Sequence, residues 1–288
     1  MSVPPVPPDD GRPLLTVVGN CQAESLRLLI DAGDVRSVRL PAVHELVADD
    51  VAGLQALVAA TDIFVGQPVG NDYHGLPVGT EQLVGHLPPG SRTALVPSVR
   101  YAGLHPYHLL VHPPGIRDPD PPLVPYHDVR TVLAAAARPA PPPLTPDAVL
   151  AVAAASVAEL DRRERVGGLV TVSDLLTRPV ADSMRTINHP GNAVLEPLAA
   201  RVRAAVGLPP APPGVDRPLL AGTHAPLMAE VVAAHHLDVA PTTRWQVAGR
   251  PLEVAAVTTL HVDWLRRRPE VLAVALERVE PLLELLGA

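Results

Sequence analysis

The distribution of proline limits where helices and strands can form in this chain. Of the 288 residues, 36 are proline, and they gather in three stretches, at 112–125, 138–146 and 208–218. Proline has no backbone donor and holds φ near one value, so these stretches cannot continue helices or central strands. Between them, short β-branched runs alternate with helical patterns, which indicates an α/β arrangement.

The local patterns place individual elements. Residues 14–18 (LLTVV) form a short apolar run typical of a buried parallel strand, and the helical spacing that follows predicts a helix ending at Gly33. Further strands are expected at 63–65 and 93–96. Further helices are expected at 146–165 after an N-capping Thr145, at 190–206, and at 269–286 with a kink at Pro281.

These elements predict an α/β fold with a mostly parallel central sheet flanked by helices and an additional helical or mixed C-terminal region. We expect residues 1–12 to be a disordered proline-rich tail, 13–208 to form the α/β catalytic region, and 219–288 to form the C-terminal region, on the acceptor side or packed on the same core.

Composition excludes several classes. The chain has no lysine, which excludes Schiff-base, pyridoxal-phosphate and P-loop lysine chemistry. Its one cysteine, Cys21, excludes an internal disulfide framework and a cysteine-rich zinc site. A net charge of -7 argues against nucleic-acid binding. The N-terminus has no secretory pattern and no apolar run is long enough to span a membrane, so a cytoplasmic protein is expected.

Gly19-Asn20-Cys21-Gln22 lies between the first strand and the first helix. Ligands of open α/β sheets bind at the carboxyl ends of the strands, where helix N-termini point. A helix N-terminus favours a thiolate, so Cys21 is a candidate nucleophile, and Asn20 and Gln22 are candidate donors to an oxyanion. The alternative, that Cys21 is a buried and inert thiol, stays open at this point.

A nucleophilic cysteine needs a base, and two of the twelve histidines have unusual settings. His105 lies in an aromatic and cationic loop after the third strand, and His189 precedes the helix that Pro190 is expected to begin. Either could instead be structural. His74 is a third candidate, with Gln67 and Tyr73 beside it as recognition groups.

Two other uses of histidine are less favoured. Neighbouring residues of an extended segment point to opposite faces, so His127 and Asp128 are not a ready dyad. No HExxH motif is present, and His105, His108 and His112 do not share a helix face, so no metal is expected.

The ordered set of motifs resembles the WcbI family of polysaccharide-biosynthesis acetyltransferases. These motifs are GNCQ, QPV, the Arg100-to-Pro106 loop, Tyr126-His-Asp, the Asp161-to-Arg165 segment before Val172-Ser-Asp, and Arg185-Thr-Ile-Asn-His-Pro. The similarity covers roughly residues 14–208, and residues 219–288 match nothing that we can assign. It implies a fold with some likeness to SGNH hydrolases, Cys21 as nucleophile with His105 or His189 as its partner, and coenzyme A or acyl-CoA as co-substrate. It further implies binding residues at Asn20, Gln22, Gln67, Tyr73, His74, Arg100, Tyr101, Arg185 and Asn188, with CoA phosphates held by Arg100, Arg185 or helix N-termini.

The motifs and the resemblance leave three alternative functions. The first is a Cys-dependent acyltransferase that moves an acetyl-like group from acyl-CoA to a hydroxyl or amine of a sugar or secondary metabolite. The second is a thioesterase or esterase with the same Cys/His site, and the third is a non-catalytic CoA- or glycan-binding module. The expected partner is a small-molecule or glycan acceptor, and the sequence does not encode the oligomeric state.

Overall fold

The computed structural model describes residues 2–111, 116, 120–211 and 215–287, and divides the chain into two compact units. Unit 1 comprises residues 1–99, 160–174 and 191–220, and unit 2 comprises residues 100–159, 175–190 and 221–288. Each unit is therefore built from three stretches of sequence. This division differs from the expected limits at 208 and 219, because the chain passes from one unit to the other at several points instead of once.

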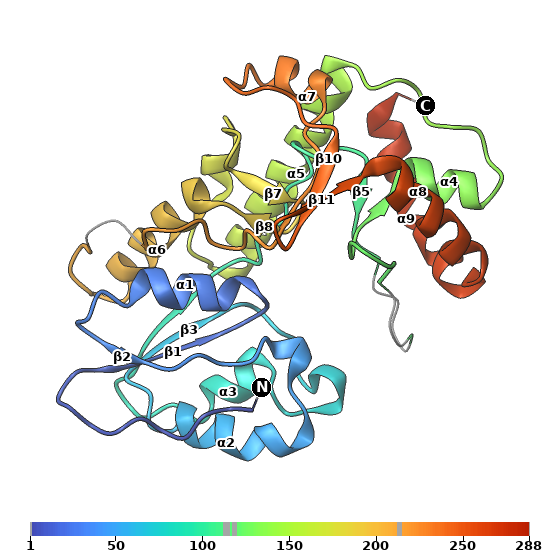
Figure 1. Cartoon of the computed structure of the whole chain (residues 1–288). Helices are drawn as coiled ribbons and strands as arrows, with labels where there is room; N and C mark the ends of the chain where they lie inside the picture. The colour runs from blue at the N-terminus through green and yellow to red at the C-terminus, as the bar shows by residue number, and fades with distance from the viewer. Residues whose placement is uncertain (1, 112–115, 117–119, 212–214, 288) are drawn as a thin grey trace. The chain divides into compact units, whose positions relative to one another are not determined.

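Unit 1 contains a parallel four-stranded sheet in the order β2-β1-β3-β4 (Figure 1). The strands are β1 (Leu14–Val18), β2 (Arg36–Ser37), β3 (Ile63–Gly66) and β4 (Arg92–Leu95). Every side chain of β1 and β3 is buried, as expected for strands covered on both faces. The strands expected at 14–18, 63–65 and 93–96 are confirmed, the last one residue earlier than expected.

Helices cover both faces of this sheet. α1 (Gln22–Ile30) lies on one face, with α6 (Asn192–Ala205) packed against it, and α2 (Ala48–Val58) and α3 (Thr80–Val84) lie on the other (Figure 1). A hydrophobic cluster that includes Leu54, Val58, Phe64 and Leu83 joins the second pair to the sheet. The predicted α/β fold with a parallel sheet between helices is thus confirmed.

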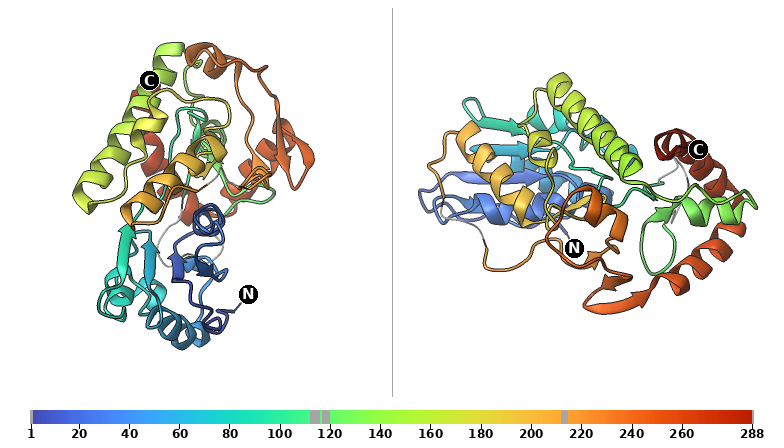
Figure 2. Two further views of the ribbon diagram at one scale, coloured as in Figure 1. Left: turned by 90° about the vertical axis from the view of Figure 1, so that its left-hand side faces the viewer. Right: turned by 90° about the horizontal axis from the view of Figure 1, so that it is seen from above.

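Two helix ends differ from the prediction, and one helix start agrees with it. α1 ends at Ile30, three residues before Gly33, whose φ of +84° belongs to the turn that follows. α6 begins at Asn192 after Gly191, because Pro190 belongs to a strand instead. α5 (Pro146–Gly167), the long helix seen along its length in Figure 2, begins where Thr145 predicts, with the Ala148 amide donating to its hydroxyl at 3.2 Å.

Unit 2 combines short antiparallel sheets with helices. The described elements are β5 (His108–Leu109), β6 (His127–Asp128), α4 (Val129–Ala135), β7 (Met184–Thr186), β8 (His189–Pro190), β9 (Thr223–His224), α7 (Ala229–Ala234), β10 (Arg244–Val247), β11 (Arg250–Glu253), α8 (Val254–Arg266) and α9 (Pro269–Leu286). α9 runs through Pro281. α4, α8 and α9 pack together (Figures 1 and 2). A second hydrophobic cluster forms around Tyr126 and Trp245. The expected helical or mixed C-terminal region is confirmed.

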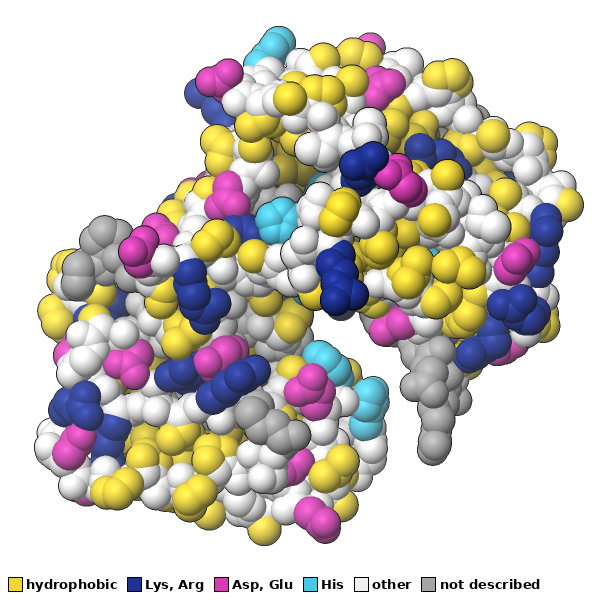
Figure 3. Space-filling model, in the orientation of Figure 1, with side chains coloured by type: hydrophobic (Ala, Val, Ile, Leu, Met, Phe, Trp, Pro, Cys, Tyr) yellow, Lys and Arg dark blue, Asp and Glu magenta, His cyan; other side chains and the backbone are white. Residues whose placement is uncertain are grey.

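The remaining short elements are 3-10 helices, at Val43–Glu45, Tyr73–Gly75 and Ser173–Leu176. The proline-rich stretch 138–145 forms no regular element, while parts of the stretches at 112–125 and 208–218, with His112, lie outside the described residues. At the N-terminus, the Val3 amide donates to Asp50 Oδ1 at 3.0 Å. In the part of the chain that the structure describes, no helix has the length and apolar character to cross a membrane. Acidic and basic side chains are interspersed on the face that Figure 3 shows.

Candidate functional site

Cys21 lies where the sheet changes winding direction. β1 pairs with β2 on one side and with β3 on the other, and ligand sites of such sheets lie beyond the carboxyl ends of the two strands that flank the change. Cys21 follows β1 by three residues and is the N-cap of α1, while Gln67 follows β3 directly. The expected strand-turn-helix position of Cys21 is therefore confirmed.

A glycine is required directly after β1. A Cβ on Gly19 would lie 2.5 Å from Gln67 Oε1 and 2.9 Å from Gln67 Cδ. This close approach lets Gln67 Oε1 accept a hydrogen bond from the Asn20 amide at 2.8 Å. The turn that carries Cys21 is thereby tied to the end of β3.

The three polar side chains around Cys21 bind one another and the backbone. Asn20 Oδ1 accepts from the Gln22 amide at 2.9 Å, and its Nδ2 donates to Ser98 Oγ at 2.8 Å. Gln22 Nε2 donates to the Val99 carbonyl, while its Oε1 accepts from the Val99 amide and from Gln67 Nε2. Gln22 and Gln67 are 1% and 4% exposed. Gln22 and Gln67, which the sequence suggested as ligand contacts, therefore fix the shape of the turn, and Asn20 alone of the three lines the cavity beside the thiol.

The half-buried thiol of Cys21 lines a cavity of about 310 Å³ within unit 1. Three charged side chains of this wall come from outside α1, namely Arg39, Glu45 and Arg217. Both arginines are exposed, and within the described residues neither guanidinium makes an ion pair or hydrogen bond. They are unpaired cations beside the only cysteine, and no motif in the sequence distinguishes them from the other arginines.

The thiol is not the activated group that the helix N-terminus predicts. Burial raises the pKa of Cys21 above its usual range, and the Glu45 carboxylate adds to the rise. The backbone amides of Cys21 and Gln22 act in the opposite direction, as expected at a helix start. Desolvation is the largest of these effects, so Cys21 is a protonated thiol at neutral pH in the free protein.

Tyr73 and His74 are not brought to this cavity. They stack on each other with ring centroids 4.1 Å apart, and His74 is exposed with φ +53°. Tyr73 packs against the cluster on the α2 side of the sheet. Neither residue lines the cavity at Cys21.

His105 belongs to unit 2 and is 4% exposed. Its Nε2 donates to the Met184 carbonyl at 3.3 Å. Burial, and next the neighbouring His108, lower its pKa to about 3, so the ring is neutral at physiological pH.

His189 also belongs to unit 2 and lies in β8, not at a helix N-terminus as predicted. Its Nδ1 is 3.5 Å from the Tyr126 hydroxyl, which donates to Asn188 Oδ1 at 2.9 Å. Burial, Arg185 and His224 lower the pKa of His189 to about 4. His189 and Asn188 are thus part of one hydrogen-bonded group around Tyr126.

Arg185 is buried in the same region, with its side chain 4% exposed and Nη1 2.8 Å from Asp182 Oδ1. Burial lowers the pKa of this guanidinium, and its Nε has no hydrogen-bond partner within the described chain. Arg100 is exposed. Tyr101 is 1% exposed, burial raises its pKa, and its hydroxyl packs where a Cβ on Gly103 would lie. Of these three predicted binding residues, only Arg100 is open to solvent.

Metal ligands do not gather in the described ranges. Across residues 2–111, 116, 120–211 and 215–287, no three His, Cys, Asp or Glu side chains come together in a way that could hold an ion. The cavity at Cys21 carries thiol, guanidinium and carboxylate groups. Unit 2 carries buried imidazoles.

Comparison with known proteins places these residues in a family. The family described as "Polysaccharide biosynthesis enzyme WcbI" matches residues 14–211. A solved structure of WcbI, described as a novel polysaccharide biosynthesis enzyme in a native form without a disulfide bond between coenzyme A and a cysteine, aligns with a TM-score of 0.76 at 19% identity. The alignment covers 96% of this chain and 100% of that chain. No curated protein sequence matches the chain. Because the family match covers well over half of its length, the chain belongs to the WcbI family of polysaccharide biosynthesis enzymes.

Proposed function

We propose that the protein is a Cys-dependent acyltransferase that moves an acetyl-like group from acyl-CoA to a hydroxyl or amine of a sugar or another small acceptor. The observation that carries the proposal is the position of Cys21: its thiol lines a cavity at the switch point of the sheet, with the backbone amide of Cys21 beside the sulfur. Such amides stabilise the oxyanion that forms when a thioester carbonyl is attacked.

The reaction has two steps. In the first, the Cys21 Sγ–acyl bond forms, the CoA sulfur–acyl bond breaks, and the Cys21 proton passes to the departing CoA sulfur. In the second, the acceptor oxygen or nitrogen attacks the acyl carbon, the Sγ–acyl bond breaks, and the acceptor proton returns to Cys21. Because the pKa of Cys21 is raised, we expect the thiol to lose its proton only when a base or the bound thioester is present.

Coenzyme A is supported by the relative and by the cavity. The WcbI structure is described with reference to a disulfide between CoA and a cysteine, and this chain has only Cys21 to form one. The unpaired Arg39 and Arg217 add cations for phosphate groups, in addition to the predicted and exposed Arg100.

The proton acceptor is proposed to be His105 or His189, as the sequence indicates. Their pKa values are lowered to about 3 and about 4, so both rings are neutral at pH 7 but are weak bases in the free protein, and the base role requires the pKa to rise when substrate is bound. We expect the true base to lower kcat when replaced by Gln, while CoA binding stays unchanged. The other variant will retain kcat.

Intact-mass spectrometry after incubation with acetyl-CoA tests the covalent step. Wild-type protein should gain one acetyl group, and Cys21→Ser and Cys21→Ala should lose the thioester adduct. Ser25→Ala is the matched control, because Ser25 lines the same cavity from the same helix. An unmodified wild type with acetyl-CoA, together with retained turnover in Cys21→Ala, would refute the proposal.

The raised pKa of Cys21 favours a second candidate, in which CoA binds at this cavity without a covalent step. That candidate expects unchanged CoA affinity in Cys21→Ala and no adduct at any pH. Product analysis with and without an acceptor separates both from a thioesterase, which releases free acid without the acceptor.

A further inference from the structure

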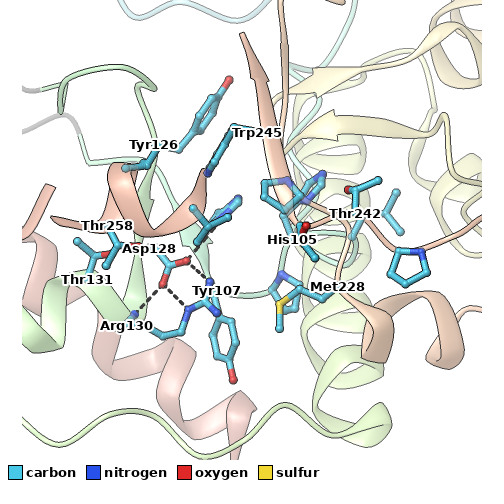
Figure 4. Close-up of a pocket in the computed structure, with 18 of the residues that line it drawn as sticks. His105, Tyr107, Tyr126, Asp128, Arg130, Thr131, Met228, Thr242, Trp245 and Thr258 are labelled. Carbon is cyan, nitrogen blue, oxygen red and sulfur yellow. Dashed lines mark hydrogen bonds and ion pairs between the residues drawn. The ribbon is translucent and has the colours of Figure 1, made fainter. Parts of the chain in front are cut away.

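Unit 2 contains a second cavity, of about 380 Å³, that shares no lining residue with the cavity at Cys21 (Figure 4). Its volume lies within the usual range for small-molecule sites. The wall is formed by the loop before β5, by β6 and α4, by the segment around α7 and β10, and by α8. Of its lining residues, the proposed covalent step uses only His105, as one of two candidate bases.

One wall of this cavity is a stack of four aromatic rings. The rings of His105 and His108 have centroids 5.6 Å apart, those of His108 and Trp245 are 5.0 Å apart, and those of Trp245 and Tyr126 are 5.8 Å apart, with interplanar angles of 13°, 16° and 14°. Trp245 is only 4% exposed. The stack fixes the plane of His108 by packing on both of its faces.

The strand pairing orients His108 further. His108 of β5 lies directly opposite Asp128 of β6, and its Nε2 is 3.7 Å from Asp128 Oδ2. Its Nδ1 is buried and, among the residues that the structure describes, has no hydrogen-bond partner. A carboxylate beside Nε2 favours the tautomer with its proton there, which leaves a lone pair on Nδ1. A buried acceptor with no partner indicates a missing donor.

The other charges of the cavity are mostly satisfied. Asp128 holds Arg130 through Nε at 2.9 Å and Nη2 at 2.6 Å, and the guanidinium lies 4.6 Å from the centre of the Tyr107 ring (Figure 4). His261 donates to the Pro122 carbonyl at 2.8 Å, and Glu230 is the remaining charged residue of the wall. With Arg130 neutralised, nothing here attracts an anion.

The rest of the wall is apolar or carries hydroxyls. Met228, Val254 and Val257 supply apolar surface, and Thr131, Thr242 and Thr258 supply hydroxyl groups. Such a wall suits an uncharged molecule with an apolar skeleton and a few hydroxyls. A phosphate or carboxylate would lose its hydration without a free cation in return.

We propose that this cavity binds an uncharged alcohol whose hydroxyl donates a hydrogen bond to Nδ1 of His108 once the side chains that now cover this atom move aside. That the alcohol is the acyl acceptor rests on the proposed function. His108 is then the group that holds the acceptor hydroxyl, while Asp128 is a positioning residue that acts through His108.

Binding of four probes with one skeleton tests the site: cyclohexylmethanol, its methyl ether, cyclohexylmethylamine and cyclohexanecarboxylate. Binding is followed by the fluorescence of Trp245, with Trp264→Phe as the background so that one tryptophan remains. We expect cyclohexylmethanol to bind about fivefold more tightly than its methyl ether, which is the value of one neutral hydrogen bond. The carboxylate probe should bind more weakly than either, because no free cation in the wall replaces its hydration.

His108→Phe retains the ring stack and removes the acceptor, so it should abolish the preference for the alcohol over the ether. An unchanged preference in this variant, or tighter binding of the carboxylate or the ammonium, would overturn the inference. If His108→Phe does not fold, the ¹⁵N shift of His108 Nδ1 in the wild type decides: cyclohexylmethanol should move it and the ether should not, and equal effects of the two contradict the proposal.

The experiments distinguish a failure of this binding site from a failure of the proposed acyl transfer. None of these measurements contains acyl-CoA, and Cys21→Ala should bind cyclohexylmethanol as the wild type does. Alcohol binding without acetylation of Cys21 leaves this site standing and counts against the proposed function. Acetylation of Cys21 without any preference for the alcohol rejects this site alone.

Discussion

Gly19→Ala tests the geometry that holds Cys21 in place. All three of the nearest atoms to a Cβ at this position belong to Gln67, at 2.5, 2.9 and 3.0 Å. The backbone at Gly19 has no positive φ, so any cost comes from the contact with Gln67 and not from backbone strain. Gln67 cannot move freely, because it is 4% exposed and bonded to Asn20 and Gln22.

One of two costs applies in this variant. If Gln67 stays in place, overpacking in a filled interior costs about 1–3 kcal/mol. If Gln67 swings away, the clash is relieved but the Asn20 amide loses its acceptor, which costs about 1–3 kcal/mol for a buried group. We therefore expect the free energy of unfolding to fall by about 1–3 kcal/mol, measured by urea unfolding followed by far-ultraviolet circular dichroism.

A double-mutant cycle identifies the cause. Gln67→Ala removes the atoms that the new methyl group meets, so the pair Gly19→Ala with Gln67→Ala should be less destabilised than the sum of the single variants by about 1–3 kcal/mol. Gly70→Ala is the control: no atom lies within 4 Å of its Cβ position, and its effect should stay within about 0.5 kcal/mol. Additive effects in the cycle, or a Gly19→Ala variant as stable as this control, would refute the reasoning.

Three further predictions follow from charges at the two sites. The rate of alkylation of Cys21 by iodoacetamide should rise with pH, with a midpoint above that of the unfolded chain, which is about 8.5. Glu45→Gln should lower the midpoint, because Glu45 helps to raise the pKa of Cys21. Equal midpoints in the wild type and in Glu45→Gln would contradict this. Arg185→Met should raise the pKa values of His189 and His224, because the Arg185 charge lowers both, and titration of the imidazole signals by NMR measures the shifts. Arg203→Ala should lower the free energy of unfolding by about 3–5 kcal/mol, since its buried guanidinium binds Asp34 and the carbonyls of Ile30 and Pro209. Arg203 lowers the pKa of Asp34. The ion pair therefore stabilises the fold above the unfolded-state pKa of Asp34, and this stabilisation is lost as the pH falls through the folded-state pKa. The Arg203→Ala variant should lack that part of the loss of stability in acid.

Local patterns predicted the sheet of unit 1 well. The apolar runs at 14–18 and 63–65 are continuous because both faces of β1 and β3 are covered, which is a property that sequence displays directly. Helix starts were less predictable at Pro190, which the pattern assigned to the first turn of a helix. There the pairing of β7 with β8 holds Pro190 in extended backbone, and Gly191 begins the helix instead.

Two properties of the candidate sites depend on residues that are far apart in the sequence. The position of Cys21 follows from neighbouring residues, but its pKa depends on burial and on Glu45, which lies 24 positions along the chain. Likewise, His127 and Asp128 were judged as neighbours and rejected as a dyad. The partner of Asp128 is His108, opposite it across a strand pair, and such register is not visible in either segment alone.

The division into two units gives this chain a built-in set of spectroscopic labels. Both tryptophans, Trp245 and Trp264, belong to unit 2, and the only cysteine belongs to unit 1. Intrinsic fluorescence therefore reports the melting of unit 2 alone, and a dye on Cys21 reports unit 1 alone. Energy transfer from the tryptophans to that dye would follow any movement of one unit against the other when cyclohexylmethanol binds, without a single substitution in the protein.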